Sequence, residues 1–330
     1  MTPPHSQEVR LAARPSDDLT ADHFSVVEAE VREPGPGEVL VRNDWMALAH
    51  VMSKLLRIEH TPEMPFATRP GDPLTSATVG TVIASQSTDL AVGDLVAHGY
   101  GWRGCVTSAA GEFARLERDL LPGAQYFLNA GPTAWRGMVE VARVSQGDTV
   151  FVSGAAGAVG SLAGQIARCQ GAKRVIGSAG SKSKVDYLVG ELGFDAAFDY
   201  HDGPVLDRLR ELAPEGIDVF FDNVSGEQFE AAVQVAVPGA RFALCGALSG
   251  RNPTLDLGPL GTRDLTIQGF SSSYDPADTH AWTKEFGRLL GQGRIAFPHT
   301  VVEGGPAAAP QALVSLLRGD YIGCVLVRLS

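Results

Sequence analysis

Hydrophobic and polar positions divide the chain into three regions of different periodicity. Residues 8 to about 125 hold short apolar runs, such as Val39 to Val41 and Thr78 to Ile83, between Gly/Pro/Asp turns, which predicts a β-rich, partly open barrel. From about Ala134 strands and helices alternate, which is typical of a doubly wound parallel α/β sheet. The last forty residues resume a different pattern. We therefore expect domains at 1–125 and 126–295, with 296–330 returning to complete the first.

The alternating region resolves into individual elements, predicted from apolar runs and helical spacing. Its strands are expected at Thr149 to Val152, Arg174 to Ser178, Ala197 to Phe198, Ile217 to Asp222, Arg241 to Cys245 and Leu265 to Phe270. Its helices are expected at Ser161 to Arg168, Ser183 to Leu192, Val205 to Leu212, Glu227 to Val235 and Thr279 to Gln292.

A small-residue turn follows the first of these strands and opens directly into a helix. In this layout the backbone amides at the helix start face a pyrophosphate, and glycine lets the cofactor approach them. Gly157 and Gly160 fit the GxGxxG fingerprint, whereas Ala155 stands where its first glycine would be. Such turns also serve plain helix–strand packing, so the surrounding elements must decide.

The next strand ends where a dinucleotide's adenosine ribose would be bound. An Asp or Glu at this place favours NAD, but no acidic residue lies between Ala172 and Val185. The segment offers Ser181, Lys182 and Lys184 instead, a hydroxyl and two ammonium groups that suit a 2′-phosphate. The sequence therefore predicts NADP(H). The alternative is that both lysines are solvated surface residues.

Composition narrows the possible partners. The net charge of -11 disfavours nucleic acids and anionic membranes, because their phosphates would be repelled. No apolar run approaches the roughly 18 residues that span a bilayer. The first ten residues lack a charged-then-apolar signal pattern, so we expect a cytoplasmic protein.

Cysteine spacing bears on metal binding. The chain contains no CxxC pair and no matched Cys, His and carboxylate pattern, so we expect a metal-free protein with buried, inert cysteines. The four cysteines are Cys105, Cys169, Cys245 and Cys324.

Five motifs occur in an order and spacing that resemble a known family. They are Ala155 to Gly160, Leu192-Gly193-Phe194-Asp195, Phe221-Asp222-Asn223-Val224, Cys245-Gly246-Ala247 and Gly269-Phe270. Together they resemble the zinc-independent medium-chain dehydrogenase/reductases, in the group of prostaglandin reductases and double-bond reductases. The resemblance implies a GroES-like catalytic domain, a Rossmann NADP-binding domain, a homodimer, and NADPH-dependent reduction of a carbon–carbon double bond conjugated to a carbonyl.

The resemblance also implies a set of cofactor-binding residues. Carried over by position, they are Thr133 below the cofactor; Gly157, Ala158, Val159 and Gly160 at the pyrophosphate; Lys184 and Tyr200 at the adenosine phosphate; and Asn223, Cys245, Gly246, Ala247, Phe270, Ser271 and Ser272 at the nicotinamide half. Plainer interpretations remain open for some. Tyr200 can cap a strand edge, Asn223 can be a turn residue, and Cys245 and Phe270 can be packing residues.

The substrate half departs from the family pattern. Ala49 to Ser53 replaces the family's Asp-Pro-Tyr-Met-Arg, Arg251 stands in place of a tyrosine, and Tyr321 in place of an asparagine. An enone reductase must stabilise an enolate and supply a proton. Tyr321 is our first candidate for this donor, followed by Arg251 and His50. Alternatively, Tyr321 only packs, and Arg251 is a surface residue.

Three functions remain open. The first is reduction of an α,β-unsaturated carbonyl by hydride transfer from NADPH to the β-carbon. The second is zinc-free reduction of a carbonyl or quinone, although no strong electrophile replaces the metal. The third is a non-catalytic NADPH-binding sensor, which would explain the altered substrate half.

Overall fold

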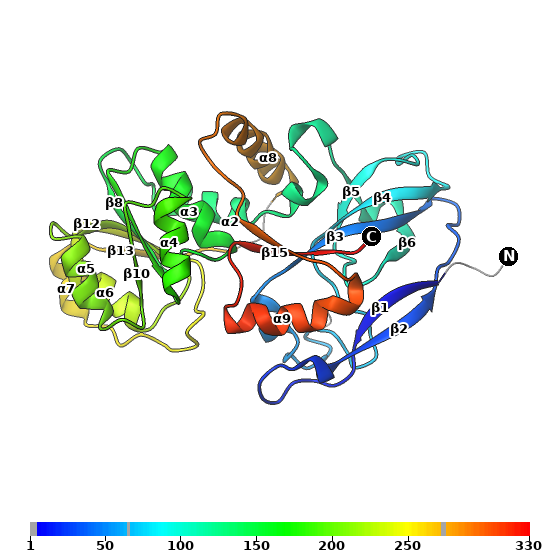
Figure 1. The fold of residues 1–330 in the computed structure, drawn as a ribbon, viewed down its shortest axis with the longest axis horizontal. Coiled ribbons are helices and arrows are strands. Elements are labelled where there is room, and N and C mark those ends of the chain that lie inside the picture. Colours follow the sequence, from blue (N-terminus) through cyan, green and yellow to red (C-terminus); the bar gives the residue numbers. More distant parts are fainter. Residues whose placement is uncertain (1–4, 65–66, 272–274) are drawn as a thin grey trace. The chain divides into compact units, whose positions relative to one another are not determined.

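The structure is a computed structural model that describes residues 5–64, 67–271 and 275–330. The chain forms two compact units. A β-rich unit combines Met1–Asn129 with His299–Ser330, and an α/β unit comprises Ala130–Pro298 (Figure 1). The expected boundaries were 125/126 and 295/296. Each unit is described by itself.

The α/β unit is built on a six-stranded parallel sheet in the order β10-β9-β8-β11-β12-β13. Its strands are β8 (Thr149–Val152), β9 (Arg174–Ala179), β10 (Ala196–Asp199), β11 (Ile217–Asp222), β12 (Ala236–Leu244) and β13 (Thr266–Gly269). The chain winds outward from β8 to β10 and then returns to β11 on the other side of β8. The order therefore reverses between β8 and β11, which confirms the predicted doubly wound fold. Ligands of such sheets bind outside the carboxyl ends of the strands at this reversal.

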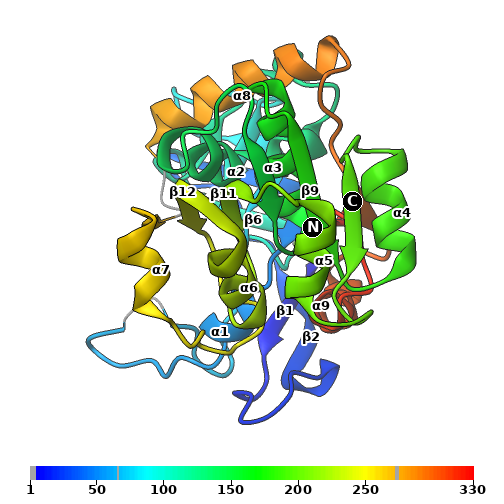
Figure 2. The same ribbon diagram turned by 90° about the vertical axis from the view of Figure 1, so that its left-hand side faces the viewer.

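Helices cover the sheet. They are α2 (Gly131–Trp135), which continues into a π-helix (Arg136–Val141), α3 (Ala158–Cys169), α4 (Lys182–Gly190), α5 (Val205–Leu212), α6 (Glu227–Val235), α7 (Leu257–Thr262) and α8 (Pro276–Gly291). Helices α5 and α6 pack on Phe151, Phe220 and Phe242, whereas α2 contacts both α3 and α8 away from them (Figure 2). The sequence did not predict α7.

Most predicted boundaries in this unit are correct within two residues, whereas the starts of α3, α8 and β12 differ by three to five residues. Helix α8 begins three residues earlier than expected, because the Asp275 carboxylate accepts a hydrogen bond from the Ala277 amide and caps the first turn. The helical segment at the start of this unit, near Ala134, is divided between α2 and the π-helix. Strand β12 starts at Ala236 instead of Arg241.

The β-rich unit contains a mixed seven-stranded sheet and a separate two-stranded ribbon, β1-β2. The sheet order is β14-β15-β3-β4-β5-β7, with β6 also paired to β3. Elements of this unit are β1 (His5–Leu11), β2 (Phe24–Glu30), β3 (Glu38–Leu48), α1 (Val51–Leu55), β4 (Thr78–Ser85), β5 (Leu95–His98), β6 (Cys105–Ala109), β7 (Ala114–Arg115), β14 (His299–Val302), α9 (Ala309–Arg318) and β15 (Cys324–Arg328). Because β15 pairs antiparallel with β3, the C-terminal tail belongs to this unit. Its pairing path has two ends, so the sheet is open.

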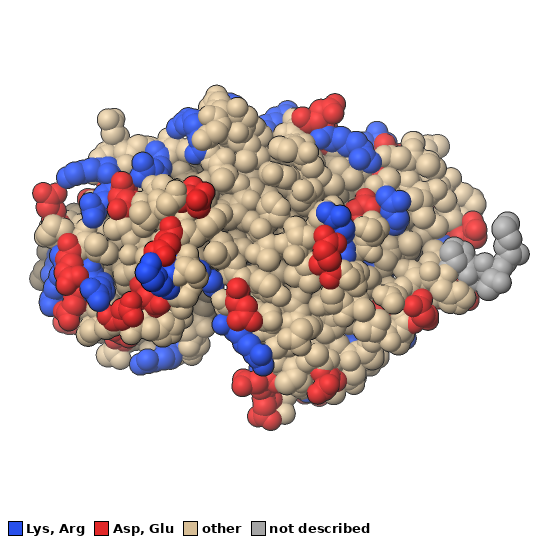
Figure 3. Space-filling view, viewed as in Figure 1, with Lys and Arg blue, Asp and Glu red and all other residues tan. Residues whose placement is uncertain are grey.

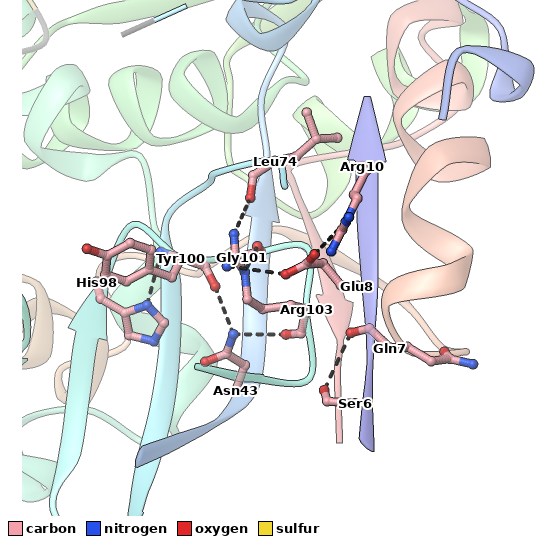
Figure 4. A network of polar contacts seen from close by, with 10 residues as sticks. All are labelled: Ser6, Gln7, Glu8, Arg10, Asn43, Leu74, His98, Tyr100, Gly101 and Arg103. Carbon is pink, nitrogen blue, oxygen red and sulfur yellow. Dashed lines mark hydrogen bonds and ion pairs between the residues drawn. The ribbon is translucent and has the colours of Figure 1, made fainter. Parts of the chain in front are cut away.

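A buried polar network joins the β1-β2 ribbon to this sheet (Figure 4). The Arg103 guanidinium lies 3.4 Å from the Glu8 carboxylate and donates to the Leu74 carbonyl. The Asn43 amide donates to the carbonyls of Tyr100 and Arg103, at 2.8 Å each. Trp102, which directly precedes Arg103 in the chain, is fully buried and has a backbone φ of 64°. Positive φ is unusual for a bulky residue, so these bonds hold a strained turn in place.

Candidate functional site

The glycine turn between β8 and α3 is closely packed at one glycine and open at another. A Cβ on Gly160 would lie 2.5 Å from the Gly154 carbonyl oxygen, so Gly160 is required for the helix to pack on the turn. A Cβ on Gly157 would meet nothing nearer than 3.5 Å. Gly160 therefore serves packing, whereas Gly157 leaves the start of α3 open.

The alanine at the first glycine position has a packing explanation. Ala155 is fully buried, and its methyl group would lie 2.8 Å from a Cβ placed on Gly177. Gly177, on the neighbouring strand β9, thus leaves the space that the methyl group fills. The departure from GxGxxG is compensated locally and does not alter the open end of the helix.

The N-terminus of α3 fits an anionic ligand. Among the residues that the structure describes, no side chain caps it, and its first turn carries no acidic residue. The uncapped amides and the positive end of the helix dipole favour a pyrophosphate. Gly157, Ala158, Val159 and Gly160 lie in this first turn or just before it, as the sequence predicts for a dinucleotide.

A buried carboxylate that the sequence analysis overlooked organises the neighbouring strand end. Asp222, the last residue of β11, is 1% exposed. One of its oxygens accepts hydrogen bonds from the Ser153 hydroxyl and from the amides of Val224 and Ser225, at 2.8–2.9 Å. Burial raises the pKa of Asp222, and these three donors oppose that shift. Asp222 thus fixes the turn that carries Asn223.

Asn223 links two strand ends. Its side-chain amide donates to the Ser153 carbonyl at 2.7 Å, and its backbone amide donates to the Ser153 hydroxyl. Its carbonyl accepts from the Leu248 amide, and a Cβ on Gly246 would lie 3.1 Å from that oxygen. Asn223 is therefore a connecting residue between β8, β11 and the segment after β12, rather than a simple turn residue.

The other side of the glycine turn is held by β9. The Gly154 amide donates to the Ser178 hydroxyl at 3.2 Å, and the Ala155 amide donates to the Ser178 carbonyl at 2.8 Å. The Ser178 hydroxyl donates in turn to the Gln228 side chain of α6. Neither Ser178 nor Gln228 was predicted, because nothing in the sequence marks a buried serine as a turn partner.

The four cysteines differ in burial. Cys324 is buried, whereas the other three are half-buried, so the expectation that all are buried is wrong. Burial and the nearby Asp222 carboxylate raise the pKa of Cys245 to about 12. A thiol with this pKa is protonated at neutral pH and not nucleophilic. Cys245 is therefore a packing residue of the strand end and not a nucleophile.

The predicted adenosine end lies at the start of α4. The Ser181 hydroxyl caps this helix by accepting from the Lys184 amide. The Lys182 ammonium lies 2.6 Å from the Asp186 carboxylate, one helical turn further along, and forms an ion pair with it. Asp186 comes directly after the segment from Ala172 to Val185 that contains no acidic residue. The Tyr200 phenol oxygen lies against Gly180, 3.0 Å from where a Cβ would stand, and its residue is 42% exposed.

The three predicted catalytic residues lie on separate elements. His50 precedes α1, and its carbonyl accepts from the Ser53 hydroxyl. Tyr321 is partly buried and packs against the main core cluster of the β-rich unit. Arg251, in the α/β unit, is exposed, and its Cβ lies 3.4 Å from the Cβ position of Gly226. Tyr321 thus has a packing role, whatever its phenol does.

The remaining predicted residues are near the strand ends or outside the description. Thr133 is half-buried in α2. Phe270 directly follows β13, and its ring meets that of Phe221 edge-on, with centroids 6.1 Å apart. The Ser271 carbonyl accepts from Arg136. Ser272 lies outside the described residues.

Two searches of the described residues concern metals and membranes. Within 5–64, 67–271 and 275–330, no group of three or more His, Cys, Asp or Glu side chains is placed to hold a metal ion. The helices in the same ranges include none with the length and apolar character needed to cross a bilayer. On the face in Figure 3, lysines and arginines stand among acidic residues and form no single basic patch.

Comparison with known proteins extends this picture. A family model described as zinc-binding dehydrogenase matches residues 158–288, and one described as the N-terminal domain of oxidoreductase matches residues 7–116. A 2-alkenal reductase (NADP(+)-dependent) of Nicotiana tabacum is 34% identical over 90% of this chain and 88% of its own. Prostaglandin reductase 1 of Bos taurus is 32% identical over 94% of both. The chain belongs to the medium-chain dehydrogenase/reductase family, in the prostaglandin reductase group.

A solved structure supports the same assignment across both units. CurA from Vibrio vulnificus, in complex with NADPH, superposes with a TM-score of 0.88 at 28% identity, covering 98% of this chain and 99% of that one. The predicted fold class and family are thereby confirmed.

Proposed function

We propose that this protein reduces a carbon–carbon double bond conjugated to a carbonyl, with NADPH as the hydride donor. The observation that carries the proposal is the open, uncapped start of α3 beside the Asp222-organised strand ends, in a chain related over most of its length to an NADP-dependent alkenal reductase and a prostaglandin reductase. When bound, NADPH supplies a hydride to the β-carbon. The chain must bind and orient the cofactor, stabilise the enolate and exclude water.

The cofactor-binding roles follow the strand ends. Gly157 to Gly160 would hold the pyrophosphate, and Ser181 with Lys184 would hold the 2′-phosphate. Asn223, Cys245 to Ala247 and the backbone at Phe270 and Ser271 would line the nicotinamide half, with Thr133 beside it. Lys182 contributes less to phosphate binding, because Asp186 already neutralises it. Tyr200 would lay its exposed ring against the adenosine.

The reaction also needs a proton donor for the enolate. We assign it first to Tyr321, whose phenol can donate to the carbonyl oxygen as the enolate forms. Arg251 and His50 are the remaining candidates. All three belong to the part of the chain that departs from the family pattern, so we assign the substrate only by class, as an α,β-unsaturated carbonyl compound.

The test is NADPH consumption against a panel of α,β-unsaturated ketones and aldehydes, quinones and saturated ketones, with product analysis. We expect saturated carbonyl products from the enones and a strong preference for NADPH over NADH. Turnover of saturated ketones or quinones alone would favour the carbonyl or quinone reductase. Tight NADPH binding without turnover of any compound would favour the sensor.

Assembly and location complete the proposal. Strand β13 pairs only with β12 among the described residues, so its outer edge offers backbone groups to a second copy. A homodimer through this edge would be seen by sedimentation at twice the mass of the chain. We propose a cytoplasmic location because the reaction needs a supply of NADPH, and cell fractionation tests it.

A further inference from the structure

An irregular helix lies against the strand ends that would hold the nicotinamide. Helix α2 continues without a break into a π-helix at Arg136–Val141, in which the Ala142 amide donates to the Gly137 carbonyl at 2.9 Å. The π-helix is rare in proteins, and the π-helical segments that do occur are frequently found at functional sites.

Gly137 lies in this π-helix and packs closely against two aromatic rings. Its ideal Cβ would lie 2.5 Å from the Phe221 ring and 2.5 Å from the Phe270 ring. No side chain fits in that space, so both rings rest directly on the helix backbone. Phe221 immediately precedes Asp222, and Phe270 immediately follows β13. One backbone position therefore contacts the carboxyl ends of β11 and β13.

A second contact holds the same strand end. The Arg136 guanidinium donates to the Ser271 carbonyl at 3.1 Å. Strand β13 has four residues and pairs only with β12 among the described residues, and three of the four are exposed. Within one copy of the chain, sheet pairing therefore constrains its end weakly. The ring contact and the Arg136 hydrogen bond constrain this end from the helix side, independently of what pairs with the outer edge of the strand.

We propose that Arg136 and Gly137 are positioning residues that fix Phe270 and Ser271 for the nicotinamide half of the cofactor. This inference rests on the proposed function. Neither residue needs to touch the cofactor, since each acts through the strand end. Their loss should therefore weaken binding of the complete dinucleotide but not of its adenosine half, which binds near α4.

The direct test is calorimetric titration of the Gly137→Ala variant of the full chain with NADP⁺ and, separately, with adenosine 2′,5′-bisphosphate. The added methyl group must displace both rings by about 1 Å to reach ordinary contact distance. We expect NADP⁺ to bind about tenfold more weakly, corresponding to one lost hydrogen bond, with the bisphosphate unchanged. Gly291→Ala is the matched control, because a Cβ there meets nothing within 4 Å and the residue also lies in a helix.

Further arms keep the test decisive. Arg136→Met removes the bond to Ser271 without adding bulk against the rings, and should weaken NADP⁺ by about threefold to tenfold with partial rescue by Arg136→Lys. This variant replaces Gly137→Ala if the latter does not fold. Unchanged NADP⁺ binding in the variants, or equal loss of both ligands in a folded variant, would overturn the inference. Wild-type protein that binds NADP⁺ but reduces no enone would overturn only the proposed reaction, whereas wild-type protein that binds no NADP⁺ would overturn both.

Discussion

Each unit contains a buried polar network, and the two networks differ in how completely they are hydrogen-bonded. In the α/β unit, the Asp222 carboxylate has three hydrogen-bond donors, and Ser153, Asn223 and Ser178 are joined to their neighbours. In the β-rich unit, the network around Arg103 leaves three buried atoms without a hydrogen-bond partner among the described residues: Asn43 Oδ1, His98 Nε2 and Trp102 Nε1. The described part of the α/β unit has one such atom, Arg174 Nε at the start of β9, away from the carboxyl ends of the strands. Paired groups fix a geometry, whereas unpaired ones cost stability. The fully hydrogen-bonded network thus lies at the proposed cofactor edge.

The largest effect should come from removing the central carboxylate. Asp222→Ala leaves the Ser153 hydroxyl and two backbone amides without their acceptor, so we expect a loss of about 3 kcal/mol in the free energy of unfolding. Urea denaturation measures it. Asp207→Ala, at an exposed ion pair with Arg210, is the control and should change stability by less than about 0.5 kcal/mol. Equal stability of the two variants would mean that Asp222 organises nothing.

The contrasting group is His98 in the β-rich unit. Its Nδ1 accepts from the Tyr100 amide, and burial together with Arg103 lowers its pKa from 6.5 to about 4 (Figure 4). The unfolded state therefore binds more protons between these values, so stability falls as pH falls from 6.5 to 4. We expect a loss of about 3 kcal/mol across this window. Denaturation of His98→Asn should show a flatter pH dependence there, and a slope equal to that of the wild type would contradict the assignment.

Alanine substitutions at two glycines of the same turn should affect different properties, stability in one case and NADP⁺ binding in the other. Gly160→Ala places a methyl group 2.5 Å from a carbonyl oxygen and should lower stability by about 2 kcal/mol. Gly157→Ala has room, so its stability should remain within about 0.5 kcal/mol of wild type while NADP⁺ binding weakens about tenfold. Thermal denaturation and calorimetry give the two readouts. If Gly157→Ala binds NADP⁺ normally, the open helix start is not the pyrophosphate site.

The sequence predicted the α/β unit more completely than the β-rich unit, for a physical reason. Buried parallel strands such as Ile217 to Asp222 are continuous apolar runs, and β11, α5 and α6 were predicted to the residue. In the β-rich unit, helix α1 was missed because a segment of five residues is too short to show the helical periodicity of apolar positions. Helix α7 was missed for the same reason, since its six residues include two glycines and a proline.

The site shows the same division. The glycine turn and its helix have a local signature, so the sequence alone suggests Gly157 and Gly160 as candidates. Asp222, Ser178 and Gln228 act through contacts between strands that are distant in the chain, and only the fold brings them together. Arg136 and Gly137 carry no motif either, because a π-helix has no periodicity that distinguishes it from an α-helix in six residues.

Tyr321 tests whether the β-rich unit contributes chemistry as well as packing. If its phenol donates to the developing enolate, Tyr321→Phe should lower kcat about thirtyfold with little change in stability, because the ring still packs on the core. Steady-state kinetics over a range of pH provides the comparison with wild type. Full turnover of the variant at every pH would exclude the phenol as the donor.

The smallest effect should distinguish two neighbouring lysines. Lys184→Ala should weaken NADPH binding by about fivefold to tenfold, through loss of a charge-assisted contact to the 2′-phosphate. Lys182→Ala should change it by less than about twofold, because Asp186 already shares that ammonium. Binding of NADH, which lacks the 2′-phosphate, should be unaffected by either change. Equal effects of the two substitutions on NADPH would contradict this division of roles.

The central claim is that hydride reaches the β-carbon of an enone, and isotopic labelling tests it most directly. The protein would be incubated with an α,β-unsaturated ketone and NADPH that carries deuterium at the transferable position of the nicotinamide. The account predicts a saturated ketone with deuterium on its β-carbon. An allylic alcohol with deuterium on the former carbonyl carbon would contradict it.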